Sequence, residues 1–184
     1  MSMKIKISDT IVILGKKGSG KTTLIKFLVE TLMKNYKITI LDVLGNFSYL
    51  CGKKNINYYL INPNDTKQIE QIANKIFSEG NQLVIFDEFD TYPYNSMHKD
   101  AMYNLFQLGR NRNIGFLLSA RRTANISKDI IANATHVFIG ATGYLPDIER
   151  LQTYYTFDMK DYHSLKQYQF LYIYDGNAIS KVMV

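Results

Sequence analysis

Residues 15–22 read Gly-Lys-Lys-Gly-Ser-Gly-Lys-Thr, the pattern G-x-x-x-x-G-K-[ST] of a phosphate-binding P-loop. A short apolar run at 11–14 precedes the loop, and a helical pattern with one apolar face follows it over 21–34. In this strand–loop–helix order, the N–H groups of the loop and the positive end of the helix both face phosphate oxygens. The sequence therefore predicts a nucleoside triphosphate site, with ATP and Mg²⁺ as its ligands.

Two positions of the P-loop have side-chain roles that the motif specifies. Lys21 is expected to act as a catalytic residue that reaches the outer phosphates, and Thr22 to hold Mg²⁺ through its hydroxyl group. The nucleotide-binding set that we expect consists of these two residues together with Gly15, Lys16, Lys17, Gly18, Ser19, Gly20 and Thr23.

A second element of the phosphate site ends at Asp87 and Glu88. Four apolar residues at 83–86 lead into these two carboxylates, which places them at the carboxyl end of a central strand, where open α/β sheets bind ligands. Asp87 is predicted to hold Mg²⁺ through a coordinated water. Glu88 is predicted to polarise a water for attack on the γ-phosphate. A water-activating carboxylate favours ATP hydrolysis over phosphate transfer to a bound acceptor.

Length and composition restrict the class of protein. The chain has 184 residues, 46% of them hydrophobic, a net charge of +6 and one cysteine. These values fit a single P-loop ATPase domain over residues 1–184 and a reducing compartment, so we expect a cytoplasmic protein. No apolar run approaches the length of a membrane span, and we expect no membrane insertion. The positive charge modestly favours polyanionic partners.

Strand and helix patterns alternate along the chain. The strands that we expect lie at 11–14, 37–42, 57–61, 82–86, 114–119 and 135–140, and the helices at 21–34, 66–78, 97–108, 127–133 and 145–155. Strands that are apolar on both faces are typical of a parallel sheet covered by helices on both sides. The segment 169–184 reads as a β-hairpin with a tight Asp175-Gly176 turn, which extends one edge of the sheet. The expected fold class is α/β.

The stretch 108–122 reads Leu-Gly-Arg-Asn-Arg-Asn-Ile-Gly-Phe-Leu-Leu-Ser-Ala-Arg-Arg. It resembles the FtsK–HerA superfamily of DNA-pumping ATPases, in which a G-R-x-x-G-I segment leads into a strand ending in A-T-Q-R-P. The segments 42–47, 129–134 and 168–184 are also similar to that superfamily. The chain is little more than the motor itself, and it most resembles the viral branch that packages genomes. The resemblance implies a RecA-like (ASCE) P-loop NTPase fold with a mostly parallel central sheet.

The resemblance also implies roles for residues outside the P-loop. Arg110 matches the arginine finger that reaches into the ATP site of the neighbouring subunit, and Arg112 is the alternative. Arg122 matches the arginine of Q-R-P. Arg121 stands at the preceding glutamine position, so Ser119 or Arg121 is expected to replace the γ-phosphate sensor.

A finger that acts in trans implies a homo-oligomeric ring, a pentamer or hexamer, around double-stranded DNA held without sequence preference. A capsid or portal protein would be a further partner, at the procapsid vertex in the host cytoplasm. Asn46 replaces the glutamate that is usual in the superfamily, so we expect the role of that carboxylate to be lost or moved. The residues considered for contacts in the pore are Lys53, Lys54, Lys99, Lys128 and Arg150.

Three other functions stay open on the sequence. An ATPase of the same class could move or assemble protein in morphogenesis or secretion. A nucleotide or small-molecule kinase would need a lid with several arginines, which the four arginines at 110, 112, 121 and 122 could imitate. A nucleotide-binding adaptor without hydrolysis is disfavoured by the intact Lys21, Asp87 and Glu88.

Overall fold

The computed structural model describes residues 3–92, 99–142 and 144–184. Their central feature is one eight-stranded sheet in the order β3-β2-β4-β5-β1-β6-β7-β8. The strands are β1 (Thr10–Leu14), β2 (Ile38–Asp42), β3 (Ile56–Leu60), β4 (Gln82–Phe86), β5 (Ile114–Ala120), β6 (His136–Gly140), β7 (Gln169–Tyr174) and β8 (Asn177–Met183). Strands β1 to β6 pair in parallel, and β7 and β8 pair antiparallel. The predicted α/β class and the terminal hairpin are confirmed.

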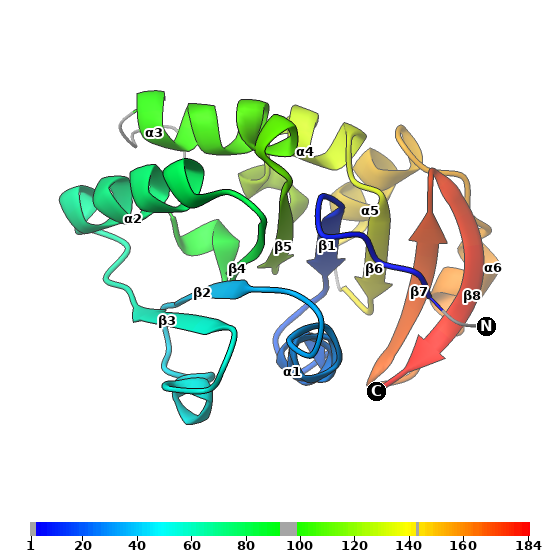
Figure 1. The fold of residues 1–184 in the computed structure, drawn as a ribbon. Helices are drawn as coiled ribbons and strands as arrows, with labels where there is room; N and C mark the ends of the chain where they lie inside the picture. The colour runs from blue at the N-terminus through cyan, green and yellow to red at the C-terminus, as the bar shows by residue number, and fades with distance from the viewer. Residues whose placement is uncertain (1–2, 93–98, 143) are drawn as a thin grey trace.

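Helices cover both faces of this sheet (Figure 1). They are α1 (Lys21–Leu32), α2 (Thr66–Glu79), α3 (Lys99–Tyr103), α4 (Lys128–Ala132), α5 (Leu145–Gln152) and α6 (Met159–His163). Helix α1 packs on one face through its buried residues, while α2, α3, α4 and α5 lie on the opposite face. The strands between these two apolar layers are buried on both sides, which explains their continuous apolar sequence. Within the described residues, no helix combines the length and apolar composition that a membrane crossing requires.

The strand register places the carboxyl ends of β1, β4 and β5 side by side, so segments far apart in the sequence meet there. Leu14 pairs with Ala120, and Phe86 pairs with Leu118, so neighbouring strands of the parallel sheet end together. The chain continues from these strand ends into Gly15, Asp87 and Arg121. The carboxyl edge of β1, β4 and β5 therefore gathers the P-loop and the acidic pair predicted from the sequence.

Two helical regions differ from the prediction. The helix expected at 97–108 begins outside the described residues, and after α3 it continues as a π-helical segment, Asn104–Leu108, and a 3-10 turn, Gly109–Arg112. The chain must turn here into β5, and the Arg112 carbonyl accepts a hydrogen bond from the N–H of Asn81 at 2.9 Å. Helix α6 was not predicted, because five residues carry too little periodicity to recognise.

A close contact at the start of β5 gives a stability prediction. A Cβ on Gly115 would lie 2.1 Å from the Ile7 carbonyl oxygen. The backbone cannot yield easily there, since Asp9 O accepts a bond from Phe116 N. Gly115→Ala should lower the free energy of unfolding by about 3 kcal/mol. In Gly109→Ala the new Cβ meets only side-chain atoms, the tip of the Phe116 ring at 3.3 Å and Ile114 Cβ at 3.4 Å, and the change should be smaller. Equal melting temperatures for the two variants would contradict this reading.

Candidate functional site

The P-loop, residues 15–22, connects β1 to α1 in a backbone conformation that glycine permits. Gly18 and Gly20 have φ of +79° and +100°. The N–H of Lys16 donates to Ala141 O at 3.0 Å and that of Ser19 to Lys16 O at 3.2 Å, which fixes the turn. Gly20 is the N-cap of α1 and has no side chain to occupy the free N–H groups of the first turn. These groups remain available to an anion.

Lys21 is buried at the start of α1. Its Nζ donates to Gly15 O at 2.9 Å and to Lys16 O at 3.3 Å. Burial lowers the pKa of Lys21, while the carboxylates of Glu88, Asp90 and Asp87 oppose that shift. Near it, the Ser19 hydroxyl is also buried and has no hydrogen-bond partner among the described residues. An ammonium held by two carbonyls and an unsatisfied hydroxyl are groups that a phosphate would engage.

Asp87 is almost completely buried and is fixed by two side chains from other strand ends. Its Oδ1 accepts from the Ser119 hydroxyl at 2.8 Å, and its Oδ2 accepts from Asn46 Nδ2 at 3.1 Å. The Ser119 hydroxyl in turn accepts from the N–H of Glu88 at 3.0 Å. Ser119 therefore connects the two acidic residues predicted from the sequence. The Asn46 contact was not predicted.

The position of Asn46 follows from a buried carboxylate at the end of β2. Asp42 accepts hydrogen bonds from the N–H groups of Leu44, Gly45 and Phe47, which folds the following loop back over the strand end. The amide of Asn46 thus lies next to Asp87 and donates to it, which a carboxylate at this position could not do.

The donor set at this edge fits Mg²⁺. The Asp87 carboxylate and the Thr22 hydroxyl are hard oxygen donors, and Mg²⁺ in such sites takes one or two protein ligands in addition to phosphates and water. Each Asp87 oxygen accepts one hydrogen bond and keeps lone pairs free. Across the described ranges, no group of three or more His, Cys, Asp or Glu side chains could hold a metal without the help of a substrate.

Glu88 lies beside Asp87 in a strained conformation. Its φ of +53° and ψ of +48° are left-handed, which is uncommon and costly for a residue other than glycine or asparagine. Its Oε2 is 3.2 Å from Arg121 Nε, which also donates to Asp90 Oδ2 at 3.2 Å. Burial raises the pKa of Glu88, against the opposing charges of Lys21 and Arg121. The sequence reasoning predicted Arg121 but missed Asp90, which only the folded turn brings to it.

Arg122 contacts residues other than Glu88 and Asp90. Its Nε is 2.7 Å from Asp147 Oδ2, and its guanidinium lies 3.8 Å from the centre of the Tyr144 ring. Arg121 and Arg122 nonetheless line one cavity of about 440 Å³ next to the P-loop, whose walls also include Lys16, Lys17, Asp90, Thr142 and Tyr144. A cavity with four cationic side chains at the P-loop suits a polyphosphate.

Arg110 lies at the opposite end of the strands from the P-loop, on the side where β5 begins. It is exposed on the turn before β5, whereas Ser119 and Arg121 lie at the other end of that strand, about 20 Å away by the rise per residue. Its carbonyl accepts a hydrogen bond from Asn113 N–H at 3.0 Å, but its side chain makes no hydrogen bond or ion pair with the described parts of the chain. Arg112 differs, because it donates to Ser78 O at 2.9 Å and stacks on Phe77. Neither arginine reaches the P-loop of its own chain.

Arg150, one of the residues considered for the pore, is half-buried and bonded to its own chain. Arg150 donates to the carbonyl oxygens of Thr123 and Ile126 at 2.9 and 3.1 Å, so it stabilises the turn after β5. Lys53 lies over the ring of Tyr49 on the surface. The side chain of Lys99 is outside what the structure describes.

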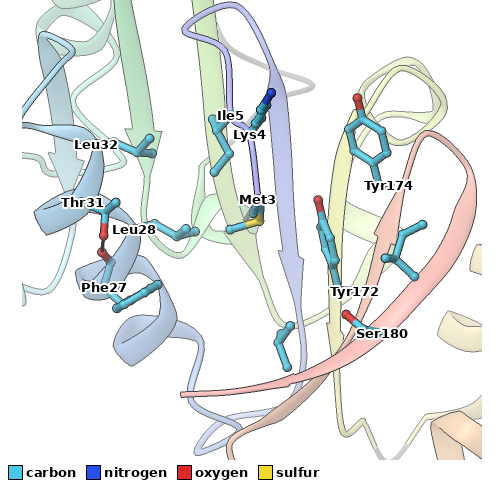
Figure 2. Close-up of a pocket in the computed structure, with 12 residues that line it drawn as sticks. Met3, Lys4, Ile5, Phe27, Leu28, Thr31, Leu32, Tyr172, Tyr174 and Ser180 are labelled. Carbon is cyan, nitrogen blue, oxygen red and sulfur yellow. Dashed lines mark hydrogen bonds between the residues drawn. The ribbon is translucent and has the colours of Figure 1, made fainter. Parts of the chain in front are cut away.

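A larger cavity of about 580 Å³ lies away from the P-loop. It is enclosed by the N-terminal segment, α1 and the β7–β8 hairpin, and Figure 2 shows Met3 and Ile5 between Phe27 and Leu28 on one side and Tyr172 on the other. Its lining is largely apolar and includes one lysine, Lys4, whereas four cationic side chains line the cavity at the P-loop. We therefore assign the phosphate site to the carboxyl edge of the sheet.

The hydrogen bonds that Ser119 makes with Asp87 and Glu88 give a further prediction. Removing the hydroxyl in Ser119→Ala takes one hydrogen bond from Asp87, which is buried, and one from the N–H of Glu88, which is partly buried. We expect the free energy of unfolding to fall by about 1–3 kcal/mol. We also expect weaker Mg²⁺-dependent binding of ATPγS. The control is Ser78→Ala, where an exposed hydroxyl bonds only its own helix. A Ser119→Ala variant as stable as that control would contradict the buried network.

Solved structures of other ATPases share this fold. The genome packaging NTPase B204 from Sulfolobus turreted icosahedral virus 2, in complex with ATP-gammaS, aligns with a TM-score of 0.78 at 20% identity, covering 96% of this chain and 98% of that chain. The type VII secretion ATPase EccC of Thermomonospora curvata (cytoplasmic domain) aligns at 0.73 and 8% identity, covering 96% and 24%. EssC of Geobacillus thermodenitrificans (ATPases 2 and 3) aligns at 0.67 and 17%, covering 92% and 38%.

These likenesses confirm the RecA-like P-loop ATPase fold, and at the level of the fold they confirm the resemblance to viral packaging ATPases. A search of curated protein sequences found no match. The profile of one protein family matches residues 11–153, a segment that contains the P-loop, both acidic residues and all four arginines discussed above. The chain belongs to the ATPase family associated with various cellular activities (AAA).

Proposed function

We propose that this protein is an ATP-hydrolysing motor that assembles as a ring and translocates double-stranded DNA, packaging a viral genome into its capsid. The observation that carries the proposal is the separation of charged groups across the sheet. Lys21, Asp87 and Glu88 meet at the carboxyl ends of the strands, while the exposed Arg110 lies at the opposite end, where its side chain has no partner among the described residues.

The residues at the carboxyl edge support hydrolysis. Lys21 is placed to exchange its two carbonyl partners for phosphate oxygens. Mg²⁺ would be held by Thr22 and Asp87, and would supply charge neutralisation between the outer phosphates. Glu88, with its pKa raised by burial, is suited to accept a proton from an attacking water.

The position of Arg110 supports a ring. Since it cannot reach its own P-loop, it can serve catalysis only at the site of a second subunit. Repetition of such a head-to-tail contact closes a ring, for which we propose five or six subunits. A finger of this kind neutralises charge that develops on the γ-phosphate.

Double-stranded DNA is the substrate that the comparisons favour. A second B204 structure is described as a DNA-packaging ATPase, and that chain matches this one nearly end to end. A net charge of +6 suits binding to phosphates without sequence preference. We place the ring at the procapsid vertex in the host cytoplasm, with a capsid or portal protein as its partner.

A second candidate is movement of protein, because the secretion ATPases EccC and EssC share the fold. In those structures, however, the matched region is 24% and 38% of a longer chain. The kinase alternative loses its main support, since Arg110 and Arg112 lie at the edge opposite Arg121 and Arg122. The four arginines do not form one lid within a subunit.

Nucleotide binding tests the basis of the proposal. Lys21→Ala should weaken ATPγS binding about 10- to 100-fold in a calorimetric titration with Mg²⁺, because a charge-assisted contact to phosphate is lost. Lys26→Ala, on the same helix but stacked over Tyr49, should leave affinity unchanged. Phosphate release from ATP without any acceptor should depend on Lys21. Unchanged binding and turnover in Lys21→Ala would reject the ATPase assignment.

A further inference from the structure

Three side chains next to the P-loop form a chain of charges that the motifs do not account for. Arg121 Nε lies 3.2 Å from Glu88 Oε2 and 3.2 Å from Asp90 Oδ2. The Asp90 side chain is only 4% exposed, whereas that of Arg121 is 46% exposed. The acid is thus anchored inside the protein, and the guanidinium can be reached by a ligand.

We propose that Asp90 and Arg121 form a latch that holds Glu88 in the nucleotide-free site, and that the γ-phosphate of ATP opens the latch by drawing Arg121 away. Asp90 is then a positioning residue that acts through Arg121. The inference rests on the proposed function as an ATPase, and it adds a means of distinguishing ATP from ADP.

The local charge balance supports the latch. Arg121 Nε is shared between two carboxylates, those of Glu88 and Asp90, and a third carboxylate, that of Asp87, adjoins Glu88 in the chain. Glu88 Oε2 and Asp90 Oδ1 are buried without a hydrogen bond in the described part of the molecule. Arg121 therefore divides one Nε–H between two acids, each at 3.2 Å. A shared, incompletely bonded cation is easily recruited by a stronger anion.

The cavity shows where that anion would be. Arg121 and Asp90 line the same cavity of about 440 Å³ as Lys16 and Lys17 of the P-loop. The strand register also sets Arg121 next to Gly15, one position beyond the pair Leu14 and Ala120. A terminal phosphate bound by the P-loop would thus compete with both carboxylates for the guanidinium, with bidentate geometry in its favour. Glu88, once released, would be free to orient a water.

The latch makes a prediction about binding that is independent of turnover. Opening it costs the pairing of Arg121 with Asp90, and only a ligand with a γ-phosphate opens it. Asp90→Asn should therefore strengthen ATPγS binding about two- to fivefold, the range of a partly exposed ion pair, and leave ADP binding unchanged. Arg121→Gln removes the group that contacts the γ-phosphate and should reduce the preference for ATPγS over ADP about tenfold.

The experiment is a thermodynamic cycle on the full chain. ATPγS and ADP are titrated with Mg²⁺ into the wild type, Asp90→Asn, Arg121→Gln and the double variant, with Arg121→Lys as the conservative change. We expect the effect of Asp90→Asn to vanish when Arg121 is absent. Arg121→Lys should retain part of the preference, since it keeps the charge but not the fork geometry.

Each alternative outcome is decisive. If Arg121→Gln lowers the affinities for ATPγS and ADP equally, or if Asp90→Asn acts equally without Arg121, the latch is wrong while the ATPase proposal stands. If the wild type binds neither nucleotide, the proposed function is overturned and the latch with it. Thermal unfolding of each variant shows whether the fold is retained; Asp90→Asn keeps the size of the side chain, and the side chain of Arg121 is partly exposed.

Discussion

Glu88→Gln should reduce the rate of ATP hydrolysis by at least about 100-fold, the lower bound for loss of a general base. The substitution keeps the size of the side chain and its left-handed backbone position, but an amide cannot take a proton from water. Nucleotide affinity should change little, because Lys21 and the N–H groups of the P-loop hold the phosphates. Steady-state phosphate release, combined with titration of ATPγS, separates the two effects.

The control for this substitution is Glu149→Gln, which removes a carboxylate from the exposed surface of α5. It should hydrolyse ATP at the wild-type rate. A Glu88→Gln protein that keeps full activity would show that another group activates the water, and Asp90 would then be the next carboxylate to test.

Arg110→Ala should have the second large effect, a loss of about 10³- to 10⁵-fold in turnover, the range known for arginine fingers. Binding of nucleotide to each subunit should remain, since Arg110 is far from the P-loop of its own chain. Arg112→Ala is the matched control on the same turn. Its guanidinium already donates to Ser78 O and stacks on Phe77, so its loss should affect stability more than turnover.

Mixing the two inactive variants tests whether the finger works between subunits. In a mixed ring, some interfaces combine an intact Glu88 from an Arg110→Ala subunit with an intact Arg110 from a Glu88→Gln subunit. Those interfaces should hydrolyse ATP, so the mixture should recover part of the activity that neither variant has alone. Assembled mixed rings without any recovery would exclude a finger in trans.

The features predicted correctly from the sequence are those that short segments determine. The P-loop needs glycines at fixed positions, and Gly18 and Gly20 indeed have positive φ. The terminal hairpin was recognisable from Asp175-Gly176, and both residues have positive φ in the tight turn. Runs of apolar residues identified the buried strands, because a parallel sheet covered on both faces has no polar side.

The features that the sequence could not supply depend on contacts between distant segments. Asn46 meets Asp87 only because β2 and β4 are neighbours in the sheet, and Arg121 meets Asp90 only because β5 ends next to the turn after β4. Similarly, Arg112 differs from Arg110 through its contacts with the Ser78 carbonyl and the Phe77 ring, both on α2, far earlier in the chain. No local pattern distinguishes such partners.

The central claim is tested most directly by steady-state ATP hydrolysis of the purified protein, with and without long double-stranded DNA, over a range of protein concentrations. If the protein is a ring motor with its finger in trans, the rate per subunit should rise as subunits assemble, and DNA should stimulate it further. Turnover that is proportional to protein concentration and indifferent to DNA would contradict the account.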